Sequence, residues 1–145
     1  MSRSLIWILP FMWMVASCSE QDGDWDSFKW DKKEYKNVSA EGGVFVSTLK
    51  NYKSCWLTST SMDDIVYEGG SIYNNYDEED STGYTYNGVL HYHYKNPRLD
   101  VQIEGNKVTM TVAPNPDPVP HKFYVDLSMG DCFGPGISIT QKAKE

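Results

Sequence analysis

Side chains suited to ligand binding concentrate between residues 84 and 94. Asn87-Gly88 is a favoured two-residue hairpin turn, and the sequence alternates on both sides of it. Cross-strand partners share a face of a sheet, so a turn at this point brings four side chains together: Tyr84, Tyr86, His91 and His93. A tyrosine ring can stack on the apolar face of a sugar while its hydroxyl forms hydrogen bonds. These four residues form the candidate platform for a sugar. The alternative is that one face of the hairpin is core and the other is an ordinary solvated sheet surface.

Metal binding and catalysis find little support in the sequence. His91 and His93 have a spacing that would suit zinc on a strand, with His121 as a third candidate ligand, but no cysteine or carboxylate has a defined place beside them. The chain lacks a Gly-x-Ser-x-Gly nucleophile motif, a phosphate-binding loop and a His-Glu-x-x-His motif. We therefore expect no metal site, no cofactor and no enzymatic activity.

The N-terminus carries an export signal. Arg3 precedes an apolar stretch over residues 5–16, and small residues lead to Cys18. The run Val15-Ala16-Ser17-Cys18 resembles the lipobox of bacterial lipoproteins, in which the cysteine thiol is acylated and becomes the new N-terminus. We expect a signal peptide over 1–17, a lipid such as palmitate on Cys18 that anchors the protein at the outer membrane or cell surface, and an acidic tether over 18–33. The alternative is a plain signal peptide with an incidental cysteine.

Two further cysteines, Cys55 and Cys132, remain for the exported domain. Exported domains form disulfides readily, which predicts a bridge between these two residues. The alternative is a pair of buried free thiols.

The segments that must position these side chains have the sequence patterns of β-strands. Residues 99–104 and 107–112 alternate strictly on both sides of Gly105-Asn106, and alternation returns over 123–127 and near the C-terminus. Residues 114–120 hold four prolines, which predicts a loop or crossover. Short alternating strands separated by turns predict an all-β, antiparallel β-sandwich. The chain has 20 acidic and 13 basic residues, a net charge of −7, which argues against a nucleic-acid partner because phosphate contacts need clustered cations.

Four short motifs, in the same order, resemble the BACON domain (Bacteroidetes-associated carbohydrate-binding, often N-terminal). They are Gly42-Gly43 before a valine-rich strand, Trp56, the run 104–115 that ends on Asn115, and the final strand 137–141. The resemblance covers about 39–141 and implies an immunoglobulin-like sandwich over 34–145. Residues 60–97 are an insertion relative to the compact form of that domain, and the predicted hairpin lies within it.

The resemblance and the candidate platform together predict a membrane-anchored, exported, non-catalytic lipoprotein that acts as a glycan-binding accessory module. The alternative is a structural spacer or a protein-interaction subunit of a cell-surface complex. The expected partners are accordingly a glycan or a surface protein, together with the membrane through the lipid on Cys18.

Overall fold

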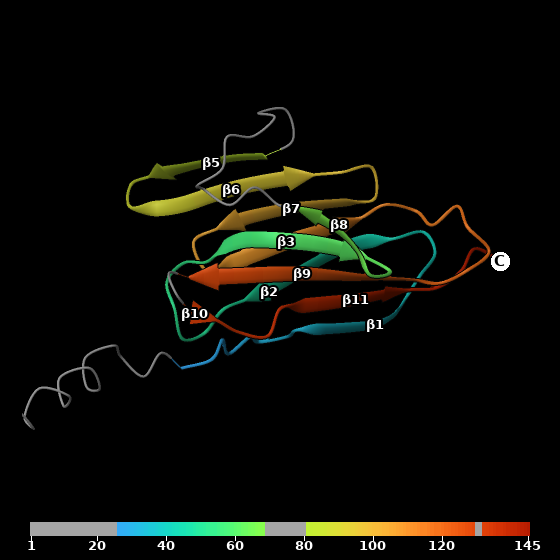
Figure 1. Ribbon diagram of the computed structural model, residues 1–145, viewed down its shortest axis with the longest axis horizontal. Coiled ribbons are helices and arrows are strands. Elements are labelled where there is room, and N and C mark those ends of the chain that lie inside the picture. The colour runs from blue at the N-terminus through green and yellow to red at the C-terminus, as the bar shows by residue number, and fades with distance from the viewer. Residues whose placement is uncertain (1–25, 69–80, 130–131) are drawn as a thin grey trace, which may run out of the picture.

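The computed structural model describes residues 26–68, 81–129 and 132–145, with the backbone alone described at 67–68, 81–86 and 132–133. These residues form two facing layers of strands (Figure 1). The strands are β1 (Glu34–Val38), β2 (Gly43–Thr48), β3 (Trp56–Met62), β4 (Ile65–Glu68), β5 (Ser81–Tyr86), β6 (Val89–Lys95), β7 (Leu99–Glu104), β8 (Lys107–Val112), β9 (His121–Met129), β10 (Cys132–Phe133) and β11 (Ile137–Gln141). The described ranges contain no helix long and apolar enough to cross a membrane.

The two sheets have simple strand orders. One is five-stranded, in the order β2-β8-β7-β6-β5. The other is six-stranded, in the order β1-β11-β9-β3-β4, with β10 paired to β9 beside β11. Every pairing is antiparallel except that of β1 with β11, which is parallel. The predicted all-β, immunoglobulin-like antiparallel sandwich with an inserted hairpin is confirmed.

The core lies between the sheets and follows the alternation of the sequence. In β7 and β8 every second residue is buried, and β9 and β11 contribute in the same way from the facing sheet. The largest fully buried apolar side chains from these strands are Leu99, Val101, Val108, Met110, Val112, Phe123, Leu127, Ile137 and Ile139. This apolar contact area is what holds the two sheets face to face.

Two predicted hairpins are confirmed with the expected turns. The β5–β6 turn has positive φ at both central residues, 48° at Asn87 and 75° at Gly88, as a type I′ turn requires. The β7–β8 turn has a φ of 60° at Gly105. A third tight turn joins β3 to β4, with φ values of 49° at Asp63 and 69° at Asp64.

The segment over 60–97 is built into both sheets. It supplies the end of β3, all of β4 at one sheet edge, and the β5–β6 hairpin, which extends the five-stranded sheet beyond β7. Tyr92 and Tyr94 on β6 are buried and join the core. One face of the hairpin therefore belongs to the core, as the alternative to the sugar platform expected.

The residues just before β1 dock on the sandwich. Phe28 is buried, its ring packs edge-on against Trp30 and Tyr52, and Trp30 donates from Nε1 to the carbonyl oxygen of Pro135 at 2.7 Å. A Cβ on Gly134 would overlap the ring of Phe28, so a glycine there permits this approach. The last residues of the expected tether thus form part of the folded domain.

Two buried amides close one end of the sandwich. Gln141 donates from Nε2 to the carbonyl oxygen of Ala113 at 2.9 Å and to that of Ala40 at 3.1 Å. Asn115, also buried, donates from Nδ2 to the carbonyl oxygens of Val119 and Lys142. These bonds tie the β1–β2 connection, the proline-rich 114–120 segment and the end of β11 together.

The predicted disulfide between Cys55 and Cys132 is wrong. Cys55 is a buried free thiol, with its Sγ 3.9 Å from the carbonyl oxygen of Gly105. Its neighbour Trp56 pairs with Ser128 on one side of β9, while Phe133, the neighbour of Cys132, pairs with Ser128 on the other side. Strand β9 therefore runs between the two cysteines, a separation of two strand spacings or about 9–10 Å. A disulfide needs Cα atoms within about 7 Å.

Candidate functional site

The candidate site is the outer face of the five-stranded sheet over β6, β7 and β8. Two rows of outward side chains cross these strands in register. One row joins His91, Glu104 and Lys107, and the next joins His93, Gln102 and Thr109. Along each strand, buried residues alternate with residues that are not buried. These six side chains are in the second set, so they lie on the outer surface of the sheet.

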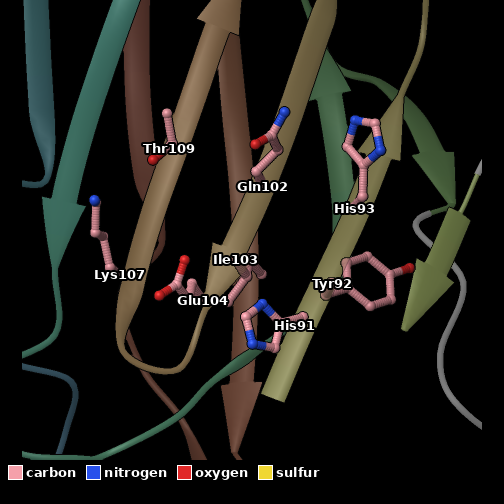
Figure 2. A pocket seen from close by; sticks show the side chains of 8 residues that line it. All are labelled: His91, Tyr92, His93, Gln102, Ile103, Glu104, Lys107 and Thr109. Carbon is pink, nitrogen blue, oxygen red and sulfur yellow. The ribbon is translucent and has the colours of Figure 1, made fainter. Parts of the chain in front are cut away.

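An open depression of about 430 Å³ lies over these rows. Figure 2 shows the six polar side chains around it, with Tyr92 and Ile103 completing the lining. The rim carries a carboxylate, an ammonium, an amide, a hydroxyl and two imidazoles, so both donors and acceptors are present. Because Glu104 and Lys107 are direct cross-strand partners, opposite charges sit side by side on this surface.

One side chain of the depression is fixed by a hydrogen bond to a carboxylate. The Nε2 of His93 lies 3.0 Å from Oδ1 of Asp100, which also accepts a hydrogen bond from Nε2 of Gln102 at 3.5 Å. Asp100 is one row away on β7, so the three side chains form a small polar network across two strands. Such a network limits the rotamers of His93 and Gln102 before any ligand arrives.

The structure partly tests the candidate platform. The backbone register pairs Tyr84 with His91 and Tyr86 with Val89, as the hairpin prediction required. His91 and His93 lie on the outer face of the sheet. The side chains of Tyr84 and Tyr86 lie outside the described part of the structure. Sequence reasoning missed Gln102, Glu104, Lys107 and Thr109, although the alternation of 99–112 already assigned them to the outward face.

The three histidines are not brought together. His91 and His93 are on the five-stranded sheet, whereas His121 begins β9 in the other sheet. In the described ranges no three or more histidine, cysteine, aspartate or glutamate side chains are placed to hold a metal ion.

His121 forms a second polar cluster, which the sequence did not reveal. Its Nδ1 contacts Oδ2 of Asp63 in the β3–β4 turn, and its Nε2 lies 2.7 Å from Oδ2 of Asp117 in the proline-rich segment. The backbone N–H of Lys122 donates to the other oxygen of Asp63 at 2.7 Å. The Nη1 of Arg98 lies 3.7 Å from Oδ2 of Asp117 and adds a positive charge to the cluster. The cluster joins three connections at the end of the sandwich.

The electrostatics of this cluster favour the charged forms. The hydrogen bond to Asp63, helped by that to Asp117, raises the pKa of His121 against the opposing effect of burial. Burial acts to raise the pKa of Asp63, but hydrogen bonds from the Lys122 backbone and His121 outweigh it and lower that pKa. An ionised carboxylate only accepts hydrogen bonds, so both ring nitrogens of His121 must donate, which requires the imidazolium form.

Comparisons with known proteins bear on the fold. No protein-family model matches the chain, and no curated protein matches it. An NMR structure of a protein from Bacteroides thetaiotaomicron is similar, with a TM-score of 0.61 and 25% sequence identity. The match covers 88% of this chain and 96% of that chain, so the likeness extends over the whole sandwich.

Proposed function

We propose that the protein is a lipid-anchored, exported, non-catalytic module that binds a neutral glycan on the outer face of the five-stranded sheet. The observation that carries the proposal is the depression of about 430 Å³ rimmed by six polar side chains from three adjacent strands. A sugar ring presents several hydroxyls that each donate and accept. A surface with interleaved donors and acceptors can therefore pair with many of them at once.

The charge arrangement favours neutral glycans over acidic ones. Lys107 lies opposite Glu104, which carries the opposite charge, and the ring of His93 is already hydrogen-bonded to Asp100. No excess of positive charge is left on the rim to attract carboxylates or sulfates. Tyr84 and Tyr86, on the neighbouring strand β5, would supply the stacking surface that the rim itself lacks.

The binding test uses a glycan array of neutral and acidic oligosaccharides with the full-length protein. We expect neutral glycans to bind, and the Gln102→Ala/Thr109→Ala pair to weaken that binding about tenfold, as the loss of one or two hydrogen bonds predicts. The Tyr84→Ala/Tyr86→Ala pair should weaken it by a similar factor through lost stacking.

The matched control is Lys36→Ala, which removes an exposed strand residue from the other sheet. It should leave glycan binding unchanged. The Gln102→Ala/Thr109→Ala protein should keep the melting temperature of the parent, because neither side chain belongs to the core. Absence of binding to every neutral glycan, or binding that survives both double substitutions, contradicts the proposal.

A second function, a protein-interaction subunit, is favoured by apolar residues at the sheet edges. Val44 on edge strand β2 and Val66 on edge strand β4 are each 63% exposed, and Ile65 is 58% exposed. Exposed apolar residues on edge strands favour pairing with another chain. Capture of a defined surface protein that is lost with Val66→Lys, together with a blank glycan array, would favour this function.

The lipid anchor is tested separately. Replacing Cys18 with alanine should prevent acylation and release the protein from the membrane fraction, since acyl burial supplies the membrane affinity in this proposal. Metabolic labelling with a fatty-acid analogue measures it directly. A Cys18→Ala protein that still carries the label, or stays with membranes at high salt, contradicts the anchor.

A further inference from the structure

The polar rows of the depression on the five-stranded sheet continue beyond it to the edge of that sheet. On β2, Val46 pairs with Thr109 and Thr48 pairs with Lys107, so each row gains one outward side chain. Val46 is 43% exposed, and Val44, the next outward residue of β2, is 63% exposed. Strand β2 is the last in the order of this sheet. The surface that begins in the depression therefore runs on to a sheet edge with small side chains.

The two rows end differently at this edge. Beyond Thr48 lies Asp31, whose Oδ1 accepts a hydrogen bond from the backbone N–H of Thr48 at 2.8 Å. The backbone N–H of Asp31 donates in turn to the carbonyl oxygen of Thr48 at 3.0 Å. The segment before β1 therefore borders the row that contains Lys107. The row that contains Thr109 ends on Val46, and the side chain of Val46 remains open to solvent.

Along the strands this surface is shorter than it is across them. The two rows are two residues apart, about 7 Å. On one side of them Asp100 is already hydrogen-bonded to His93 at 3.0 Å, and on the other side β7 and β8 end at the turn Gly105-Asn106. Across the strands, three spacings of about 4.8 Å separate β6 from β2, a span of about 14 Å. The long dimension of the surface therefore lies across the strands.

An extended glycan chain matches this long dimension. A pyranose unit advances such a chain by about one strand spacing, so a chain laid across the sheet meets a new strand with each sugar. At β6 and β7 it meets the imidazole of His93 and the amide of Gln102. At β8 it meets the hydroxyl of Thr109, which lies in line with them in Figure 2, and at β2 it meets the apolar side chain of Val46. Sugars carry both hydroxyls and an apolar C–H face, so a row that changes from polar to apolar can contact each in turn.

We propose that the outer face of the five-stranded sheet takes an extended, neutral oligosaccharide of about four sugar units, laid across β6, β7, β8 and β2. This inference rests on the proposed glycan-binding function and specifies the length and direction of the ligand. At the β2 edge the chain leaves the protein over Val46, an uncharged side chain. The site therefore accepts an internal stretch of a longer polysaccharide and does not need a free chain end on this side.

The dependence of affinity on chain length is the first measurement. Isothermal titration calorimetry of the full-length protein uses cello-, manno-, xylo- and malto-oligosaccharides, each from the disaccharide to the hexasaccharide. In at least one series we expect affinity to rise about tenfold or more from the disaccharide to the tetrasaccharide, because further hydrogen bonds and an apolar contact are added. The hexasaccharide should bind no more weakly than the tetrasaccharide, since its extra units extend beyond the sheet edge.

A gain of affinity locates the β2 end of the chain. Val46→Trp places a flat aromatic ring at an exposed strand position, where tryptophan is a favourable residue. Stacking on a sugar should strengthen binding of the tetrasaccharide about two- to tenfold and leave the disaccharide, which stays within the depression, unchanged. A selective gain of this kind cannot arise from a damaged fold. Val66→Trp, at an exposed position of β4 in the other sheet, is the matched control and should change neither affinity.

Failure of this inference can be told apart from failure of glycan binding. The proposed length and direction are overturned by affinity that does not depend on chain length, by a hexasaccharide that binds more weakly than the tetrasaccharide, or by a Val46→Trp protein without the selective gain. In each of these cases glycan binding itself stands. If none of the four series binds, the extended ligand is overturned, and the array of neutral glycans decides the broader function.

Discussion

Replacing His121 with glutamine should remove a pH-dependent part of the protein's stability. In the folded protein His121 donates to Asp63 and Asp117 at once, which only the imidazolium can do. Its pKa is raised, so it binds its proton more tightly when folded than when unfolded. The stabilisation is therefore complete below the unfolded value of about 6.5 and is lost as the pH rises through the higher folded value.

The size of the effect follows from the exposure of the partners. A hydrogen bond to a charged group contributes about 1.5–3 kcal/mol when well buried. The side chains of Asp63 and Asp117 are 40% and 45% exposed, so water competes with His121 for both. Taking the lower figure, we expect His121→Gln to lower the free energy of unfolding by about 1.5 kcal/mol under acidic conditions. Under basic conditions, where the parent has lost the second bond, the difference should fall below about 1 kcal/mol.

The charged groups around His121 determine the pH range over which this cluster stabilises the fold. Arg98 opposes the imidazolium, and the Lys122 backbone N–H holds Asp63 in its ionised form. The pKa of Asp63 is lowered, so its contribution is present above its unfolded value of about 3.8 and is lost as the pH falls through the folded value. Stability from this cluster should thus be greatest between the two transitions.

Urea unfolding at about pH 5.5 and about pH 9, followed by tryptophan fluorescence, measures the effect. Urea carries no charge and does not screen the ion pairs. His93→Gln is the matched control, because its pair with Asp100 is at the surface, with the imidazole 46% exposed, and should cost less than about 1 kcal/mol. The reasoning is refuted if parent and His121→Gln show the same change in unfolding free energy between the two pH values.

Three further changes test the rest of the fold. Gly42→Ala should destabilise the protein more than Gly88→Ala: both glycines have positive φ, 77° and 75°, which costs an alanine about 1–2 kcal/mol, but only at Gly42 would the new Cβ also overlap a backbone carbonyl, that of Val112. Thermal melts should rank them in that order, and equal losses would show that the close approach is unimportant. Asn115→Ala should cost about 2–4 kcal/mol by chemical denaturation, because four side-chain hydrogen bonds disappear. Asn115→Asp keeps the oxygen that accepts from Arg98 and Asp117 but places its second carboxylate oxygen against the carbonyl oxygens of Val119 and Lys142, so it should destabilise the protein as well; an Asp variant as stable as the parent would contradict the assigned donors. Cys55 should resist iodoacetamide in the folded protein, since burial raises the pKa of its thiol to about 12 and the thiolate is the reactive form, and should react after unfolding; mass spectrometry showing rapid labelling of folded Cys55 would contradict its burial.

The fold could be predicted from the sequence where the two-residue period was strict. Strands β7 and β8 show this best: turn chemistry at Gly105-Asn106 and alternation on both sides were enough to assign every inward residue. The burial of Tyr92 and Tyr94 could not be predicted in this way. Both faces of that hairpin carry aromatic residues, and only the pairing of β6 with β7 decides which face meets the core.

Contacts between distant residues could not be predicted. The disulfide failed because strand order, which the sequence does not encode locally, places β9 between the cysteines. The His121 cluster depends on the β3–β9 pairing, which brings Asp63 beside a residue 58 positions away. Each side chain alone is an ordinary polar residue, so no local signal marked the cluster.

The residues that carry the resemblance to BACON domains have a structural role here. Gly42 lies against the end of β8, the backbone N–H of Asn115 donates to the carbonyl oxygen of Ala40 at 2.7 Å, and Gln141 donates to the same carbonyl oxygen. They meet at one end of the sandwich and close it. Motifs of this kind therefore inform the fold more than the function.

The parallel pairing of β1 with β11 determines how the domain would respond to a mechanical load. The two strands run side by side in the same direction, with Glu34 beside Ser138 and Val38 beside Gln141 (Figure 1). A pull that draws the N-terminal side of β1 and the C-terminal side of β11 apart acts along both strands in opposite directions. The hydrogen bonds between them are then sheared together instead of being unzipped one at a time. A domain tethered at its N-terminus and pulled from its C-terminus would for this reason yield abruptly, at a single high force.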